Sequence, residues 1–141
     1  MARINWGRVV VGGLLWFVVF NVLWIVALIL YLGPEVQAAF RALGVQYRPT
    51  PAFALVWFVL TFVGGVIGVW LYASVRPRYG PGPKTAAIVG VAFWLIGNFI
   101  PMMFFGAMGL FSAQFVAIDT VTALVAMVLA TLAGAWLYWE A

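Results

Sequence analysis

The chain has 141 residues, of which 67% are hydrophobic and only 7% are charged. A soluble domain is about 45–50% apolar and about 25% charged, so this composition indicates a protein surrounded by lipid. With no cysteine and no histidine, the chain has no disulfides, no thiolate or imidazole metal or haem ligands, and no histidine general base.

Four apolar runs are long enough to cross a bilayer, which takes about 20 helical residues. They extend from about Val9 to Leu32, from Ala52 to Val75, from Thr85 to Phe105 and from Gln114 to Tyr138. The sequence therefore predicts an all-α, polytopic membrane protein. We expect residues 1–141 to form a single transmembrane domain, a four-helix bundle.

Proline and glycine mark the segments between these runs. Pro51 and Pro83 suit the first position of a helix. Residues Pro34 to Gly44 predict a short amphipathic helix that lies on the membrane surface, with a lid over an outer cavity as the alternative. Pro and Gly alternate from Arg76 to Lys84, which predicts a short stiff turn without helix.

Basic residues predict the orientation of the bundle. Five of the seven lie before the first run or between the second and third, and two lie in the first loop. The positive-inside rule then places both termini in the cytoplasm of a multi-pass membrane protein. Arg76, Arg78 and Lys84 are also candidates for binding an anionic lipid head group, although we favour the simpler interpretation that they are a topology signal.

The chain also shows signs of an internal repeat. The second run ends in Gly68–Tyr72 (GVWLY) and the fourth in Gly134–Tyr138 (GAWLY). The pairs Gly12 with Trp16 and Gly90 with Trp94 recur at the same spacing in the first and third runs. These matches predict two parallel-repeat helical hairpins, unless both halves converged on residues common at membrane interfaces.

Three polar side chains within the runs are the candidate site: Asp119, Asn21 and Asn98. A helical rise of about 1.5 Å per residue places all three in one layer of the outer half. Buried polar groups in lipid are costly, so a cluster here would suit a cation, a proton or a polar head group. In the structural alternative, which we favour, the two asparagines hydrogen-bond Asp119 and set the register of the helices, or Arg41 or Arg48 pairs with Asp119.

Small residues form stripes on the second and fourth runs. At helical spacing such stripes allow close contact between membrane helices, and we expect these two runs to pack together. The helix-packing candidates are Gly64, Gly65, Gly68, Ala126, Ala130 and Gly134.

The opening Asn5-Trp6-Gly7-Arg8, the turn Arg76–Lys84 and the Gly-x-Trp-Leu-Tyr endings support a resemblance. The chain resembles small bacterial four-span membrane proteins over nearly its whole length. This resemblance implies a four-span fold and a bacterial inner membrane, and it transfers no site residue.

Three functions fit these observations. We expect a non-enzymatic subunit or scaffold of a membrane complex, associated with itself or with a partner membrane subunit, without cofactor, metal or nucleic acid. One alternative is a small homo-oligomeric channel or transporter for a cation, proton or polar solute that uses Asp119. The other is a binder of lipid or another hydrophobic ligand, suggested by eight Trp and twelve Phe.

Overall fold

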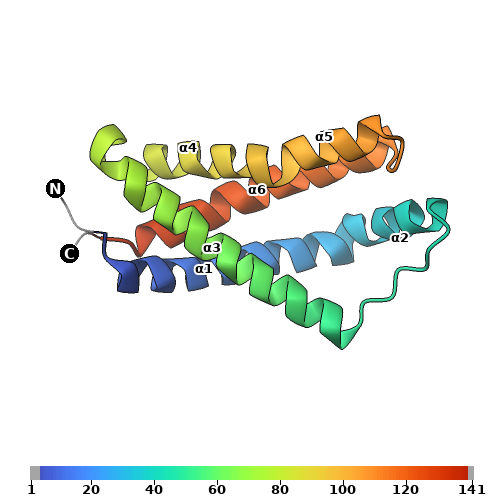
Figure 1. Cartoon of the computed structure of the whole chain (residues 1–141), viewed down its shortest axis with the longest axis horizontal. Helices are drawn as coiled ribbons and strands as arrows, with labels where there is room; N and C mark the ends of the chain where they lie inside the picture. Colours follow the sequence, from blue (N-terminus) through green and yellow to red (C-terminus); the bar gives the residue numbers. More distant parts are fainter. Residues whose placement is uncertain (1–3, 140–141) are drawn as a thin grey trace.

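Helices make up most of residues 4–139, the part of the chain that the computed structural model describes (Figure 1). Within it, four continuous helical stretches are long and apolar enough to cross a membrane, which confirms the predicted fold class. The elements are α1 (Trp6–Ala27), η1 (Leu28–Leu32), α2 (Gly33–Ala42), α3 (Pro51–Tyr79), α4 (Pro83–Trp94), η2 (Leu95–Phe99), α5 (Ile100–Ala107) and α6 (Ala113–Trp136).

Side-chain caps set where three of these helices begin. Asn5 accepts a hydrogen bond from the Arg8 N–H at the start of α1. Thr50 caps α3 through the Phe53 N–H, and Ser112 caps α6 in the same way. Each cap satisfies a backbone donor that the first turn of a helix leaves unpaired.

The predicted turn from Arg76 to Lys84 is wrong for its first half, because α3 continues to Tyr79 with Pro77 inside it. A proline in the last turn costs only one backbone hydrogen bond, so the helix tolerates it there. Gly80 follows the last helical residue, and its φ of 85° suits glycine. The Thr85 hydroxyl donates to the Gly80 carbonyl at 2.7 Å. The actual turn is therefore shorter than predicted.

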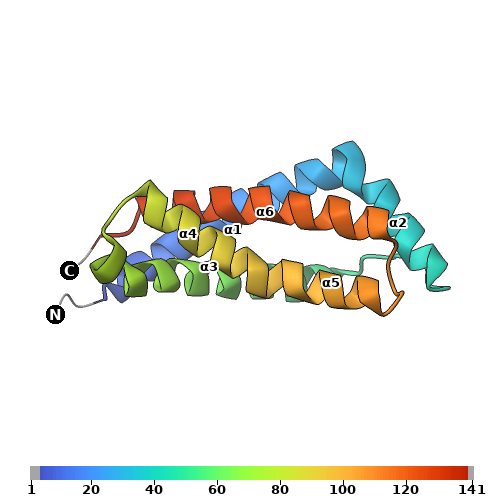
Figure 2. The ribbon, with the colours of Figure 1, turned by 90° about the horizontal axis from the view of Figure 1, so that it is seen from above.

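The short helix predicted for residues 34–44 is present as α2, but it is not a separate surface element. α1, η1 and α2 form one helical stretch, Trp6–Ala42, which bends near η1 (Figure 2). The Glu35 carboxylate on α2 accepts a hydrogen bond from the Gln114 amide on α6 at 3.1 Å. Because Ala39 is also buried, α2 packs against the bundle.

Both π-helical segments have the same relation to a proline. η1 ends at Leu32, two residues before Pro34, and η2 ends at Phe99, two residues before Pro101. A proline has no N–H, and its ring clashes with the carbonyl four residues earlier. Widening the helix by one residue relieves that clash, which explains both bulges.

Glycines allow α1 to approach two helices closely. A Cβ atom on Gly65 of α3 would lie 2.5 Å from the Gly13 carbonyl of α1, and one on Gly12 would lie 2.6 Å from the Gly134 carbonyl of α6. Of the three α3 glycines, Gly65 meets the backbone of α1, whereas Gly64 and Gly68 lie next to Phe93 of α4, so the expected pairing of this glycine face with α6 is wrong. The backbones of α1, α3 and α6 can approach this closely only because glycine has no side chain at the points of contact.

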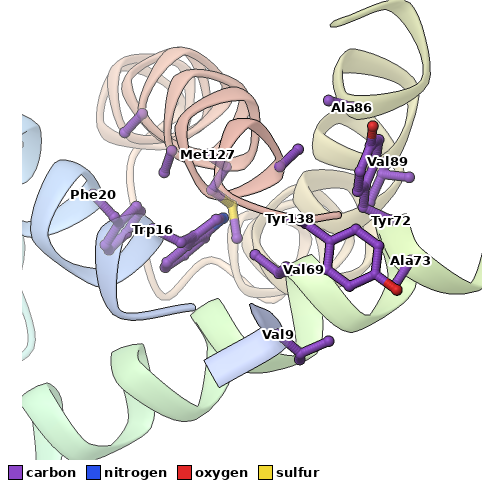
Figure 3. Packing of buried hydrophobic residues seen from close by; sticks show 13 residues of the cluster. Val9, Trp16, Phe20, Val69, Tyr72, Ala73, Ala86, Val89, Met127 and Tyr138 are labelled. Carbon is purple, nitrogen blue, oxygen red and sulfur yellow. The ribbon is translucent and has the colours of Figure 1, made fainter. Parts of the chain in front are cut away.

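The core lies where α1, α3, α4 and α6 meet. Trp16, Val69 and Met127 point into the space between the helices (Figure 3). The Trp16 indole N–H donates to the Thr131 hydroxyl at 3.0 Å, and this hydroxyl is fully buried. The hydrogen bond joins α1 to α6 and satisfies two polar groups that lipid cannot solvate.

Candidate functional site

Asp119 and Asn98, two of the three predicted site residues, lie together. Asp119 is on α6 and only 7% exposed, and the Asn98 amide in η2 donates to its carboxylate at 2.9 Å. The Asn98 carbonyl oxygen is buried and has no hydrogen-bond partner among residues 4–139. The pair joins the third helical stretch to the fourth within one chain.

Asn21, the third predicted site residue, belongs to a different group. Its amide donates to the Thr61 hydroxyl of α3 at 3.1 Å and to the Phe17 carbonyl at 2.9 Å. Its carbonyl oxygen accepts from the Trp57 indole N–H at 2.9 Å. The predicted three-residue cluster is therefore two separate groups, because Asn21 faces α3 while Asp119 faces η2.

The predicted basic head-group candidates lie at the end of the bundle that carries the termini. Arg78 and Lys84 are exposed on either side of the turn between α3 and α4. Arg76 is partly buried, and its guanidinium carbon lies 5.7 Å from the centre of the Tyr138 ring. The three cations therefore differ in setting, and Arg76 is part of the packing between α3 and the C-terminal segment.

A cavity of about 340 Å³ opens at the opposite end of the bundle. Its walls come from α1 and η1, from α2, from the connecting segment 43–50 and from the first half of α3. The start of α6 closes it. We call it the aromatic cleft. Seven aromatic side chains line it: Trp24, Phe40, Tyr47, Phe53, Trp57, Phe58 and Phe115.

Five of these rings form a continuous chain of contacts. Trp24 on α1 lies 6.0 Å from Trp57 on α3 between ring centres, and Trp57 lies 6.3 Å from Phe53. Tyr47 then contacts Phe53 at 6.3 Å and Phe40 on α2 at 5.1 Å. Offset and edge-on ring contacts of this kind are favourable beyond their buried area. They hold the walls of the aromatic cleft in place.

The shape of the cleft follows from the contact between α1 and α3. The two backbones touch where Gly13 meets Gly65, and further along the same helices carry Trp24 and Trp57. Indole side chains need far more room than glycines, so the helices separate towards the start of α3 (Figure 1). Asn21, which lines the cleft, and Thr61, joined to it by a hydrogen bond, lie on the side of the cleft nearer the crossing.

Sequence reasoning missed this site, although a signal for it was present. Phe53 and Trp57 are four residues apart on α3, and Trp24 and Leu28 have the same spacing in the first stretch. That spacing places each pair on one helical face. The counts of Trp and Phe had suggested a hydrophobic ligand, but they did not show which rings would converge.

Comparisons of this chain with protein-family models, with curated proteins and with solved structures find no match.

Proposed function

We propose that this integral membrane protein binds the hydrocarbon chain of one lipid molecule in the aromatic cleft. The observation that supports this function is the cleft itself, about 340 Å³ of space between helices, walled mainly by aromatic rings. Sites for small hydrophobic ligands are typically apolar cavities of about 300–1,000 Å³ with few polar groups. Asn21 is the only amide side chain among the lining residues, and three hydrogen bonds already occupy it.

The walls of the cleft include aromatic surface that no other part of the described chain covers, and a lipid chain could cover it. Phe53 and Phe58 remain 46% and 43% exposed, although both face the cavity. A chain that leaves the bilayer for the cleft gains no hydrophobic free energy, because both environments are apolar. Its preference must come from dispersion contacts with rigid rings, and these depend on close fit. A cleft of this kind therefore binds by shape.

The other predicted functions draw less support from the geometry. A channel that uses Asp119 needs this carboxylate on a conduction path. In this structure the Asp119 side chain is buried, and its carboxylate is hydrogen-bonded to Asn98 of the same chain. The subunit or scaffold function, with its oligomer, stays a prediction, and lipid binding in the cleft does not depend on it.

A substitution that fills the cleft tests the proposal. Ala54 on α3 lines the cavity, and the next residue, Leu55, lies outside its lining and is 66% exposed. We expect Ala54→Trp to occupy the space that a lipid chain would take, whereas Leu55→Trp adds an indole to the same helix and leaves the cleft open.

Native mass spectrometry after delipidation in mild detergent provides the measurement. We expect one phospholipid to stay bound to the parent protein and to the Leu55→Trp variant, and to be lost from the Ala54→Trp variant. Equal retention by both variants would show that any bound lipid lies elsewhere. A parent protein that retains no lipid would exclude the proposed function.

A further inference from the structure

The mouth of the aromatic cleft carries two arginines. Arg41 lies in the last turn of α2, and Arg48 lies in the segment that leads to α3. Each directly follows a ring of the cleft wall, Phe40 and Tyr47, and these two rings are 5.1 Å apart between centres. The contact between the rings therefore brings two cationic positions to the same edge of the cavity. Both arginines are exposed.

Neither arginine is neutralised within the described part of the chain. The Arg41 guanidinium donates to the neutral Gln37 side-chain amide oxygen at 3.5 Å. Residues 4–139 contain two carboxylates, and both are engaged elsewhere. Glu35 accepts from Gln114 on α6, and Asp119 accepts from Asn98. Neither arginine therefore has an ion-pair partner in the described part of the chain, and at the cleft mouth these two cations outnumber Glu35, the carboxylate of α2.

Taken with the proposed lipid binding, on which this step depends, the geometry points to a phospholipid with a net negative head group. Its hydrocarbon chain lies in the aromatic cleft, and its phosphate lies against Arg41 and Arg48. Guanidinium groups suit this role because their planar donors match phosphate oxygens in pairs. The occupant we infer is an anionic phospholipid of the leaflet at this end of the bundle.

The head group explains how the site would select one lipid from a bilayer. Every phospholipid offers similar chains, so chain packing alone discriminates weakly. One basic residue near the surface improves binding of an anionic lipid by about fivefold, and two improve it by about 25-fold if they act independently. We therefore expect the parent protein to prefer an anionic over a zwitterionic lipid by about 25-fold.

The test compares phosphatidylglycerol with phosphatidylcholine of identical chains, titrated against the purified protein and followed by native mass spectrometry. The variant is Arg41→Gln with Arg48→Gln, and the matched control is Arg78→Gln, an exposed arginine at the opposite end. We expect the double variant to lose the preference for phosphatidylglycerol while it still binds phosphatidylcholine. The control is expected to keep the full preference.

The outcomes separate this inference from the proposed function. If both lipids bind the parent protein equally, and Ala54→Trp abolishes both, the cleft binds lipid and the head-group inference is wrong. Loss of the preference in Arg78→Gln alone would overturn it as well, because the anion would then lie at the opposite end. Inorganic phosphate that abolishes the preference would indicate a free phosphate site. Binding of neither lipid would exclude both proposals.

Discussion

Two adjacent glycines in α3 provide a matched test of how the bundle packs. A Cβ atom on Gly65 would lie 2.5 Å from the Gly13 carbonyl oxygen and 3.1 Å from a ring carbon of Trp16. On Gly64, the nearest atom would be a ring carbon of Phe93 at 3.8 Å, an ordinary van der Waals distance. Alanine at these two positions makes the same chemical change in two different environments.

The expected difference in stability follows from two opposing effects. Alanine is favoured over glycine in a helix interior by about 1 kcal/mol, and both variants gain this. Overpacking a tight contact costs about 1–3 kcal/mol, and only the Gly65 variant incurs it. The clash is with a backbone carbonyl, which moves only if α1 moves. We therefore expect Gly64→Ala to stabilise the protein and Gly65→Ala to be about 1–3 kcal/mol less stable than Gly64→Ala.

Equilibrium unfolding in mixed micelles, with an increasing fraction of denaturing detergent, measures this difference through the fluorescence of the eight tryptophans. Because the helix propensity of alanine contributes equally to both variants, their difference isolates the contact between α1 and α3. If Gly65→Ala is as stable as Gly64→Ala, the backbones do not approach each other at Gly13, and the explanation of the aromatic cleft fails with it.

Two further predictions concern the polar groups, and the same unfolding assay measures both. Trp57→Phe keeps a ring in the cleft wall but removes the donor to Asn21, so a double-mutant cycle with Asn21→Leu should give a coupling of about 0.6–1.7 kcal/mol; a coupling of zero would contradict this hydrogen bond. Asn98→Leu leaves Asp119 without its donor and should cost about 1–3 kcal/mol. Asp119→Asn keeps an acceptor for Asn98 and should cost less, and the reverse order would argue against the pairing.

Several features of the fold could be predicted from the sequence because they depend on local interactions. The lengths of the apolar runs identify the four membrane-spanning stretches. In lipid, a segment that spans the bilayer must be helical, because its backbone N–H and C=O groups have no water to bond. Pro51 and Pro83 occupy the first positions of α3 and α4, as their place before the apolar runs predicts. The prolines were harder to interpret. Pro34 and Pro101 widen helices instead of ending them, and Pro77 is tolerated in a last turn, so a proline alone does not predict the outcome.

The candidate polar site shows where local information was insufficient. Depth along the membrane follows from residue number, and Asn21, Asn98 and Asp119 were therefore expected in one layer. Which of them meet depends on the direction in which each helix faces, and the tertiary structure pairs Asn98 with Asp119 while Asn21 binds Trp57. Rotation about the helix axis is determined by neighbouring helices, so depth alone did not define a cluster.

Composition and apolar length thus determined that this protein is a membrane-embedded bundle of four long helices. The tertiary structure decided which helices touch, and with that where the aromatic cleft lies. The physical reason is that lipid makes every apolar helix face equally acceptable, so hydropathy cannot choose a partner. That choice depends on where backbones can meet, at Gly12 with Gly134 and at Gly13 with Gly65. Beyond the second contact, Trp57 and its aromatic neighbours keep α3 away from α1.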